Sequence, residues 1–223
     1  MAINLKSTGN ASTNGVKVVV YGQAGTGKTS LIATLPNPII LSAEGGLLSI
    51  SDSNLPYIEI TSIESLREAY KWASESEEAK NFDSIALDSI SEIAEVVLNF
   101  EKKIAKDPRQ AYGALQEQMT DIIRAFRDLA NKNVYFTAKC EKSADEAGRV
   151  MYAPSMPGAK LGQQLPYFVD EVLALRVEKD QEGVPRRALM CESDGLWQAK
   201  DRSGKLSAWE APDLGAIIKK IGG

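Results

Sequence analysis

The sequence of 223 residues predicts an α/β fold: a mainly parallel sheet flanked by helices, with antiparallel strands at its C-terminal edge. Three observations support this prediction. Short apolar, β-branched segments alternate with amphipathic segments through most of the chain, as in βαβ units. A glycine-rich turn separates the first apolar segment from the helical segment that follows. Closely spaced strand-like segments then succeed one another near the end, which is typical of antiparallel pairs.

Strands are expected where short apolar or β-branched runs lie between turn signals. They cover residues 16–21, 38–42, 56–60, 82–88, 133–138, 171–178, 185–192 and 196–200. Helices are expected over residues 29–35, 63–79, 91–103, 112–131 and 212–221. Pro36 ends the first helix, and Ser62 caps the second. Residues 141–164 hold two prolines and three glycines without periodicity, which predicts one long loop.

The domain organisation follows from length and local composition. Residues 16–223 are expected to form one domain, because single α/β domains of about 200–250 residues are common. Residues 1–15 are expected to form a flexible leader, since residues 7–15 are polar and resemble a linker. Residues 3–5 are interpreted as a frayed end in preference to a short strand for self-association, and both interpretations stay open.

Composition excludes several classes of function. With 43% apolar and 25% charged residues, the chain is typical of soluble globular proteins, and its net charge of −4 offers no overall basic footprint for nucleic acid. Histidine is absent, and Cys140 and Cys191 lack CxxC spacing, which excludes Cys/His zinc sites and Ser-His or Cys-His catalysis. No apolar run reaches about 18 residues and no signal segment is visible, so we expect a cytoplasmic protein without membrane contact.

The most specific motif is a G-x4-G-K-T sequence between an apolar strand and a helix, the context that confirms a P-loop. Its glycines let the backbone curl so that several N–H groups point at one phosphate, and the helix N-terminus adds a partial positive charge. Lys28 is expected to contact the β- and γ-phosphates of ATP, and Thr29 to ligate Mg²⁺. The predicted nucleotide-binding residues of this motif are Gly22, Gln23, Ala24, Gly25, Thr26, Gly27, Lys28, Thr29 and Ser30.

Two acidic residues follow predicted strands. Asp88 ends the strand at 82–88, where a carboxylate holds a water on Mg²⁺ in the Walker B role, so it is assigned to the nucleotide and metal site in preference to a helix N-cap. Ser89 could assist it. Glu44 ends the second strand, at the sheet edge where ligands gather, and could orient an attacking water as a catalytic residue. Spacing alone favours this role no more than that of a solvated loop acid beside Gly45.

The order of these motifs resembles the RecA-type recombinase core over about residues 16–205. Glu44 matches the position of that family's catalytic acid, and Asp88 with Ser89 resembles the end of its Walker B strand. Residues 112–115 and 134–139 resemble the stretch between the family's two DNA-binding loops, and residues 158–161 the end of the second loop. RecA-like cores often carry a glutamine that links the ATP site to that loop. Lys139 takes its place here, which assigns Lys139 to the nucleotide site and leaves γ-phosphate sensing open.

A narrower resemblance rests on the one-domain scale, the turn at 43–46 and residues 200–204. It is to the phage nucleotide-binding proteins, RecA-like single-strand annealing ATPases that form the fourth class of Sak recombinases. It implies ATP-stimulated binding of single-stranded DNA, strand annealing in phage recombination, self-association into a ring or filament, and a single-strand DNA-binding protein as a further partner. It also implies that Lys200 and Arg202 contact a neighbouring subunit's γ-phosphate, with a charged hairpin turn as the alternative. The large extra domains of cellular RecA have no counterpart, so full strand exchange is not expected.

Basic residues track DNA phosphates, and an aromatic ring can stack on a base. Two basic clusters flank the segments that resemble the DNA loops. Glu141, Asp145 and Glu146 weaken the case for the second cluster, and solvated surface charge explains both clusters almost as well. The predicted DNA-binding residues are Lys102, Lys103, Lys106, Arg109, Lys142, Arg149, Tyr152 and Lys160.

Two other functions compete with DNA recombination. A helicase-loader or packaging-type motor would use the same P-loop on a protein partner. A small-molecule kinase is disfavoured, because such kinases place an arginine-rich lid over the phosphates and the long loop at 141–164 holds only Arg149.

Overall fold

A computed structural model describes residues 14–144 and 148–222. The strands are β1 (Lys17–Gly22), β2 (Pro38–Ser42), β3 (Tyr57–Glu59), β4 (Ser84–Asp88), β5 (Asn133–Ala144), β6 (Val150–Ser155), β7 (Glu171–Lys179), β8 (Pro185–Met190), β9 (Lys200–Asp201) and β10 (Trp209–Glu210). The α-helices are α1 (Ile63–Glu75), α2 (Ile90–Ile104), α3 (Pro108–Arg127), α4 (Ala159–Phe168) and α5 (Leu214–Gly222). Three 3₁₀ helices are η2 (Thr29–Thr34), η3 (Leu47–Ser53) and η4 (Glu78–Asn81).

The strands form one sheet in the order β10-β8-β7-β1-β5-β4-β2-β3, with β6 paired to β5 and β9 to β7. The strands from β7 to β3 in this order are parallel, whereas β6, β8, β9 and β10 pair antiparallel. This confirms the predicted α/β class, with its mainly parallel sheet and antiparallel C-terminal edge. Because parallel strands end at one edge, Gly22 pairs with Lys139 and Ser42 with Asp88 there.

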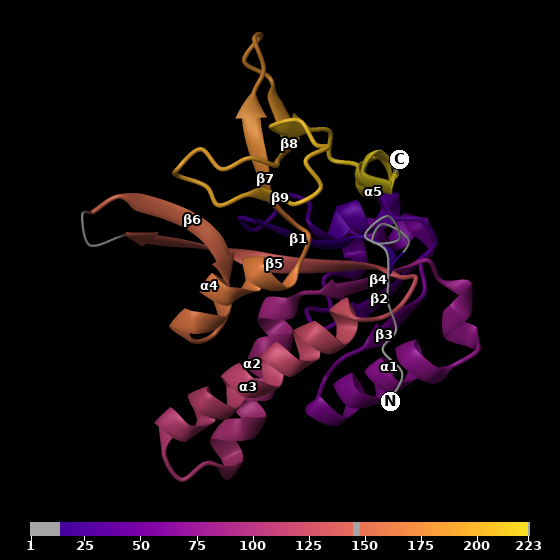
Figure 1. Cartoon of the computed structure of the whole chain (residues 1–223), viewed down its shortest axis with the longest axis vertical. Helices are drawn as coiled ribbons and strands as arrows, with labels where there is room; N and C mark the ends of the chain where they lie inside the picture. The colour runs from indigo at the N-terminus through magenta and orange to yellow at the C-terminus, as the bar shows by residue number, and fades with distance from the viewer. Residues whose placement is uncertain (1–13, 145–147, 223) are drawn as a thin grey trace, which may run out of the picture.

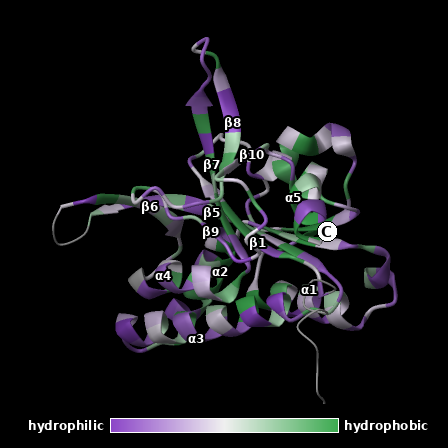
Figure 2. Cartoon of the chain, turned by 45° about the horizontal axis from the view of Figure 1, so that its top comes forward, coloured by the Kyte–Doolittle hydropathy of each residue, from purple (hydrophilic) through white to green (hydrophobic). Residues whose placement is uncertain are grey.

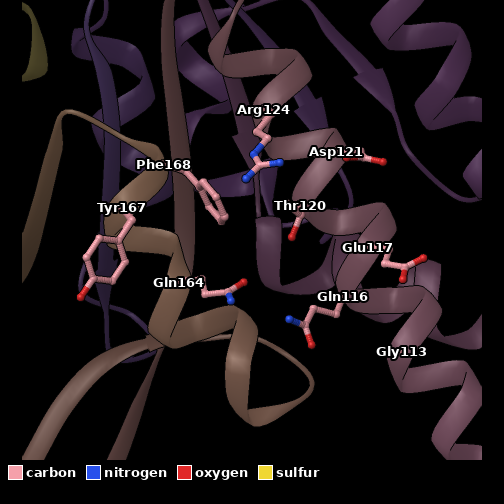
Figure 3. Close-up of a pocket in the computed structure, with 9 residues that line it drawn as sticks. All are labelled: Gly113, Gln116, Glu117, Thr120, Asp121, Arg124, Gln164, Tyr167 and Phe168. Atoms are coloured by element: carbon pink, nitrogen blue, oxygen red, sulfur yellow. The ribbon is translucent and has the colours of Figure 1, made fainter.

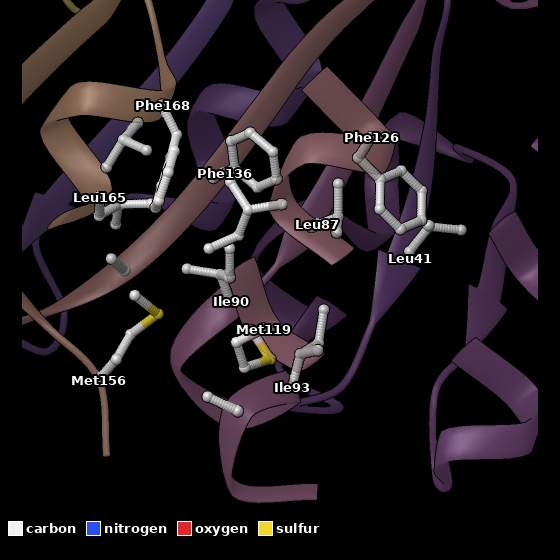
Figure 4. Packing of buried hydrophobic residues seen from close by; sticks show 14 of the residues in the cluster. Leu41, Leu87, Ile90, Ile93, Met119, Phe126, Phe136, Met156, Leu165 and Phe168 are labelled. Atoms are coloured by element: carbon white, nitrogen blue, oxygen red, sulfur yellow. The ribbon is translucent and has the colours of Figure 1, made fainter. Parts of the chain in front are cut away.

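Alternating strand residues feed two hydrophobic clusters on opposite faces of the sheet, as the period of two requires. Val19 and Leu41 face the cluster covered by α1, α2, α3 and α4, whereas Val18 and Ile40 face the cluster covered by η2, η3 and α5. Figure 4 shows the first cluster, where Phe136 of β5 lies among side chains of the covering helices. Both clusters therefore pack on the same sheet, one on each face.

The helices begin where capping residues satisfy their first N–H groups. Ser62 caps α1 by accepting from the N–H of Ser65 at 3.1 Å, and Ser89 caps α2 by accepting from the N–H of Glu92 at 3.2 Å. Helix α3 begins at Pro108, four residues before the predicted start at 112. Proline at the first helical position loses no hydrogen bond there, so the segment taken as a break is a helix start.

Three predicted elements are wrong. The helix expected at 29–35 is a 3₁₀ helix, and the strand expected at 196–200 is reduced to a bridge and the short β9. The long loop predicted at 141–164 is instead the end of β5, the antiparallel β6 and the start of α4. The outer half of β5 is exposed on both faces, so it lacks the apolar alternation by which strands are found.

Two hairpins extend beyond the core, β5–β6 (residues 139–155) and β7–β8 (residues 175–190) (Figure 1). Figure 2 shows hydrophobic colouring along the central strands and mostly hydrophilic colouring toward the tips of both hairpins. An aromatic stack anchors the β5–β6 hairpin, because the rings of Tyr152 and Trp197 lie 4.3 Å apart at an interplanar angle of 12°. The Tyr21 hydroxyl lies 3.0 Å from the Tyr152 carbonyl and 2.7 Å from that of Gln198. Tyr21, the second-to-last residue of β1, is thereby hydrogen-bonded to Tyr152 of the hairpin.

Candidate nucleotide-binding site

The glycine-rich loop borders a cavity of about 540 Å³ at the carboxyl end of β1. A side chain at Gly22 would place its Cβ 2.7 Å from the Leu175 carbonyl oxygen, so only glycine fits there. Gly25 and Gly27 have φ angles of +77° and +100°, which L side chains rarely adopt. The cavity is in the range of about 300–1,000 Å³ typical of ligand pockets. Its lining residues are Gly22, Gln23, Ala24, Gly25, Gly27, Lys28, Thr29, Ser30, Glu44, Ser49, Lys139, Cys140 and Arg187.

The loop presents hydrogen-bond donors to this cavity. Between described residues, no hydrogen bond uses the backbone N–H of Gly25, Gly27 or Lys28. The ammonium of Lys28 lies across the loop, 2.9 Å from the Gly22 carbonyl oxygen and 3.0 Å from that of Gln23. Burial lowers the pKa of Lys28, and the carboxylates of Glu44 and Asp88 oppose that shift. Phosphates in the cavity would meet free amides and an ammonium that lacks a full counter-charge.

The predicted metal residues lie together beside the loop. The Thr29 hydroxyl donates to Asp88 Oδ2 at 2.8 Å, and the Thr137 hydroxyl donates to the other carboxylate oxygen of Asp88. Since Ser89 caps α2, Asp88 is not the helix cap that was its alternative role. Mg²⁺ is usually held by one or two side chains together with substrate phosphates, and this hydroxyl–carboxylate pair fits that pattern. Among the described residues, no cluster of three or more metal-ligating Cys, Asp or Glu residues exists.

Glu44 borders the same cavity and is held by its neighbours. Ser89 donates its hydroxyl to Glu44 Oε1 at 2.7 Å. The N–H of Ala43 donates to the Asp88 carbonyl oxygen at 2.8 Å, which fixes the end of β2 against the end of β4. The Glu44 carboxylate is thus oriented by Ser89, which is distant in the sequence but adjacent in space. Glu44 remains solvent-exposed.

Lys139 reaches the cavity from β5, in register with Gly22. Its ammonium forms an ion pair with Glu92 of α2, and this hydrogen bond raises the pKa of Lys139. The backbone N–H of Lys139 donates to the Ser91 hydroxyl at 2.9 Å, which in turn donates to the Ser155 carbonyl oxygen at 2.6 Å. Lys139 and Ser155 form the first residue pair of the β5–β6 hairpin. Both are hydrogen-bonded to Ser91 at the start of α2, and Lys139 also lines the cavity.

Sequence reasoning missed four residues at this site: Ser49, Thr137, Cys140 and Arg187. Thr137 carried a signal, because a polar residue within a buried strand needs a hydrogen-bond partner. Arg187 carried none, because it comes from β8, more than 150 residues away in the sequence, and only the β7–β8 hairpin brings it to the loop.

The residues predicted to act on a neighbouring subunit lie elsewhere. Lys200 pairs with Val172 near the start of β7, toward the edge opposite the P-loop, and neither Lys200 nor Arg202 lines the nucleotide cavity. The Lys200 ammonium donates to the Pro166 and Val169 carbonyl oxygens at 2.5 and 2.7 Å, at the end of α4. Arg202 pairs with Asp170 at 3.0 Å. Their positions leave them out of reach of the cavity of their own chain.

The segment that carries Lys200 and Arg202 contacts the buried Glu171, which lies beside the partly exposed Asp201. Burial, together with the neighbouring Asp201 carboxylate, raises the pKa of Glu171 to about 8. Glu171 accepts from the N–H of Ser203 at 3.3 Å, while Asp201 accepts from the N–H of Gly204 at 3.0 Å. The turn after β9 therefore has a defined conformation in the single chain.

The predicted DNA-binding residues fall into two groups. Lys102 lies 5.8 Å from the ring centroid of Tyr112, and Tyr112 and Lys160 line one small cavity of about 310 Å³. Lys103, Lys106 and Arg109 are exposed around the turn between α2 and α3.

The second group lies on the β5–β6 hairpin, where Lys142 and Tyr152 are register partners and Arg149 directly precedes β6. Stacking on Trp197 covers one face of the Tyr152 ring.

A larger groove of about 890 Å³ lies between α3 and α4, away from the P-loop (Figure 3). Gln116 of α3 faces Gln164 of α4 across it, and Tyr167, which also lines it, is 80% exposed. It adjoins the small cavity through Gly113 and Gln116. None of the predicted site residues lines this groove.

The parallel sheet, the glycine loop at the end of β1 and the Thr29–Asp88 pair define a P-loop ATPase-type domain. A sequence model described as an AAA domain matches residues 14–203, most of the chain, and this protein belongs to that family. None of the helices in the described ranges has the length and apolar composition needed to cross a bilayer.

Two solved structures align with this chain, and the first of them shares its fold. An ATPase from the type III secretion system of pathogenic bacteria aligns with a TM-score of 0.50 at 14% identity, covering 73% of this chain. The chain spans about half of that ATPase, 52% of its length. A KaiC-like protein of the hyperthermophilic archaeon Pyrococcus horikoshii aligns with a TM-score of 0.44 at 13% identity, covering 79% of this chain and 78% of its own. No curated protein sequence matches significantly.

Proposed function

We propose that this protein hydrolyses ATP at the P-loop cavity, binds single-stranded DNA when ATP is bound, and promotes strand annealing. One observation carries the link between the two activities. Strand β5 lies in register with the P-loop strand at Lys139 and continues without a break into the β5–β6 hairpin, which carries Lys142 and Arg149. A change at the nucleotide site would thus act on the hairpin through a continuous strand.

The cavity residues have different roles in the proposed hydrolysis. Lys28 and the loop amides bind the phosphates, and Glu44, held by Ser89, accepts a proton from the attacking water. Thr29 and Asp88 would hold the magnesium ion, which supplies positive charge to the phosphate oxygens. Thr137 keeps the Asp88 carboxylate in place by its hydrogen bond. The Lys28 ammonium must leave its two carbonyl partners to reach a γ-phosphate.

Two basic surfaces support the DNA proposal. One comprises Lys102, Tyr112 and Lys160, where a cation and an aromatic ring lie together beside the start of α4. The other comprises Lys142 and Arg149 of the hairpin. Both flank the segments that resemble the DNA loops of RecA-like cores, and lysine and arginine side chains of this kind neutralise phosphates without base specificity.

The proposal is tested by ATP hydrolysis with and without poly-dT, and by fluorescence anisotropy of labelled poly-dT at two salt concentrations. We expect ATP to strengthen binding and salt to weaken it by counterion release. A Lys142→Ala, Arg149→Ala double variant should bind more weakly, whereas a Lys71→Ala, Arg67→Ala double variant of α1 should not. If neither binding nor turnover responds to DNA, the partner is a protein, as for a helicase loader or packaging-type motor.

We further propose that ATP lies between subunits of a ring or filament and that Lys200 and Arg202 contact the neighbour's γ-phosphate. The position of Lys200 and Arg202 away from the cavity of their own chain supports a role toward another subunit.

A self-association strand at residues 3–5 would lie outside the described residues. A single-strand DNA-binding protein is the further partner that the resemblance to phage annealing ATPases implies.

The Arg202→Ala variant is expected to lose DNA-stimulated turnover while it binds ATP normally, because Arg202 would act as an arginine finger, contacting only the γ-phosphate bound by a neighbouring subunit. Steady-state phosphate release with poly-dT and calorimetric ATP binding measure the two effects. Arg127→Ala is the matched control, since Arg127 is also a surface arginine paired with an aspartate, Asp128. Normal stimulated turnover in the Arg202 variant would rule out the finger role.

A further inference from the structure

Arg187 is the cation at the nucleotide cavity that neither the sequence motifs nor the proposed mechanism uses. It lies on β8, opposite Val177 of β7, in the β7–β8 hairpin. Its guanidinium Nε lies 3.4 Å, and its Cζ 3.5 Å, from the point where a Cβ on Gly27 would be. It is one of the residues that line the cavity. The hairpin thus holds a positive charge directly over the glycine loop.

Within residues 14–144 and 148–222, Arg187 has no acidic partner, unlike the arginines around it. Arg176 pairs with Asp194, and Arg186 pairs with Asp180. Between described residues, no hydrogen bond or ion pair involves the guanidinium of Arg187. A guanidinium with five N–H donors beside unpaired backbone amides is suited to bind phosphate oxygens.

The strand order places Arg187 at one end of the loop. Glu44 and Asp88 come from β2 and β4, which lie on the β5 side of β1, whereas β8 lies on the β7 side. These acids and Thr29 mark the end of the cavity for the γ-phosphate and the metal. Arg187 approaches Gly27 from the opposite side, so a nucleotide lying along the loop would meet it before the γ-phosphate.

We propose that Arg187 binds the α- and β-phosphates of the nucleotide from within the same subunit, as a third donor group beside the loop amides and Lys28. The proposal rests on ATP binding at this cavity, as stated above. Because the γ-phosphate lies at the other end, Arg187 contributes to ATP and ADP alike. It affects the Kd and KM of the nucleotide and leaves the turnover of bound ATP nearly unchanged.

The test is competition by ATP, ADP and adenosine against a fluorescent nucleotide, with steady-state hydrolysis alongside. Arg187→Ala should weaken ATP and ADP binding about tenfold each, as loss of a charge-assisted hydrogen bond predicts. Adenosine binding and kcat should stay within about twofold, and Arg187→Lys should recover part of the affinity. Arg186→Ala is the matched control, with the same charge change one residue away and its guanidinium on Asp180.

Three results would overturn the assignment: unchanged nucleotide affinity in Arg187→Ala, an equal loss for adenosine, or a fall in kcat at constant KM. An equal loss for adenosine would mean stacking on the base, and a fall in kcat would mean contact with the γ-phosphate. Wild-type protein that binds neither ATP nor ADP would overturn the proposed function as well. Melting temperatures without nucleotide establish that each variant is folded.

Discussion

The Glu44→Gln variant is expected to bind ATP as tightly as the wild type and to hydrolyse it about 100-fold more slowly or worse, because a general base contributes at least that much. Glutamine keeps the size of the side chain and can still accept the hydrogen bond from Ser89, which is 2.7 Å in the wild type. It cannot take a proton from water. Phosphate release and calorimetric ATP binding measure the two effects separately.

Glu59→Gln provides the control for this experiment. Glu59 ends β3 in register with Ser42, one strand further along the same sheet edge, and does not line the cavity. It should hydrolyse ATP at the wild-type rate. Wild-type turnover in Glu44→Gln would remove Glu44 from the chemistry and leave it as the solvated acid that spacing alone also allowed.

The Lys28→Ala variant is expected to lose both ATP binding and turnover. Hydrogen bonds to charged groups contribute about 1.5–3 kcal/mol each, and Lys28 would contact two phosphates, so ATP affinity should fall about 100-fold. The folded chain should tolerate the change, because the Lys28 ammonium donates to the carbonyl oxygens of Gly22 and Gln23 in its own loop, and the Lys28 backbone carbonyl that accepts from Tyr135 is kept.

Calorimetric titration with ATP measures this loss, and thermal melting without ATP measures the folded state. Lys71→Ala on α1 is the control, an exposed lysine away from the cavity. A Lys28 variant that keeps wild-type affinity would mean that the nucleotide does not lie along this loop.

Much of the fold could be predicted because the parallel strands are buried on both faces and therefore appear as uninterrupted apolar runs. Strands β1, β2 and β4 were placed within a residue or two of their ends. The P-loop was equally visible, since its glycines are required by backbone geometry at Gly22, Gly25 and Gly27 themselves. Asp88 was found by its position at the end of β4. The buried strands, the P-loop and Asp88 could be recognised because each depends only on adjacent residues or on the composition of one segment.

The β5–β6 hairpin was mistaken for a loop because its outer residues are exposed on both sides, so burial imposes no alternation on them. The pairing of Glu44 with Ser89, and of Asp88 with Thr137, follows from the register of β2, β4 and β5, which no single segment encodes.

The sequence by itself determined the class of fold, the phosphate-binding loop and the acidic strand ends. Only the tertiary structure decided which side chains of β8 lie over that loop, and it placed Arg187 there. Local sequence carries backbone requirements and burial, whereas contacts between distant strands depend on how the whole sheet is ordered.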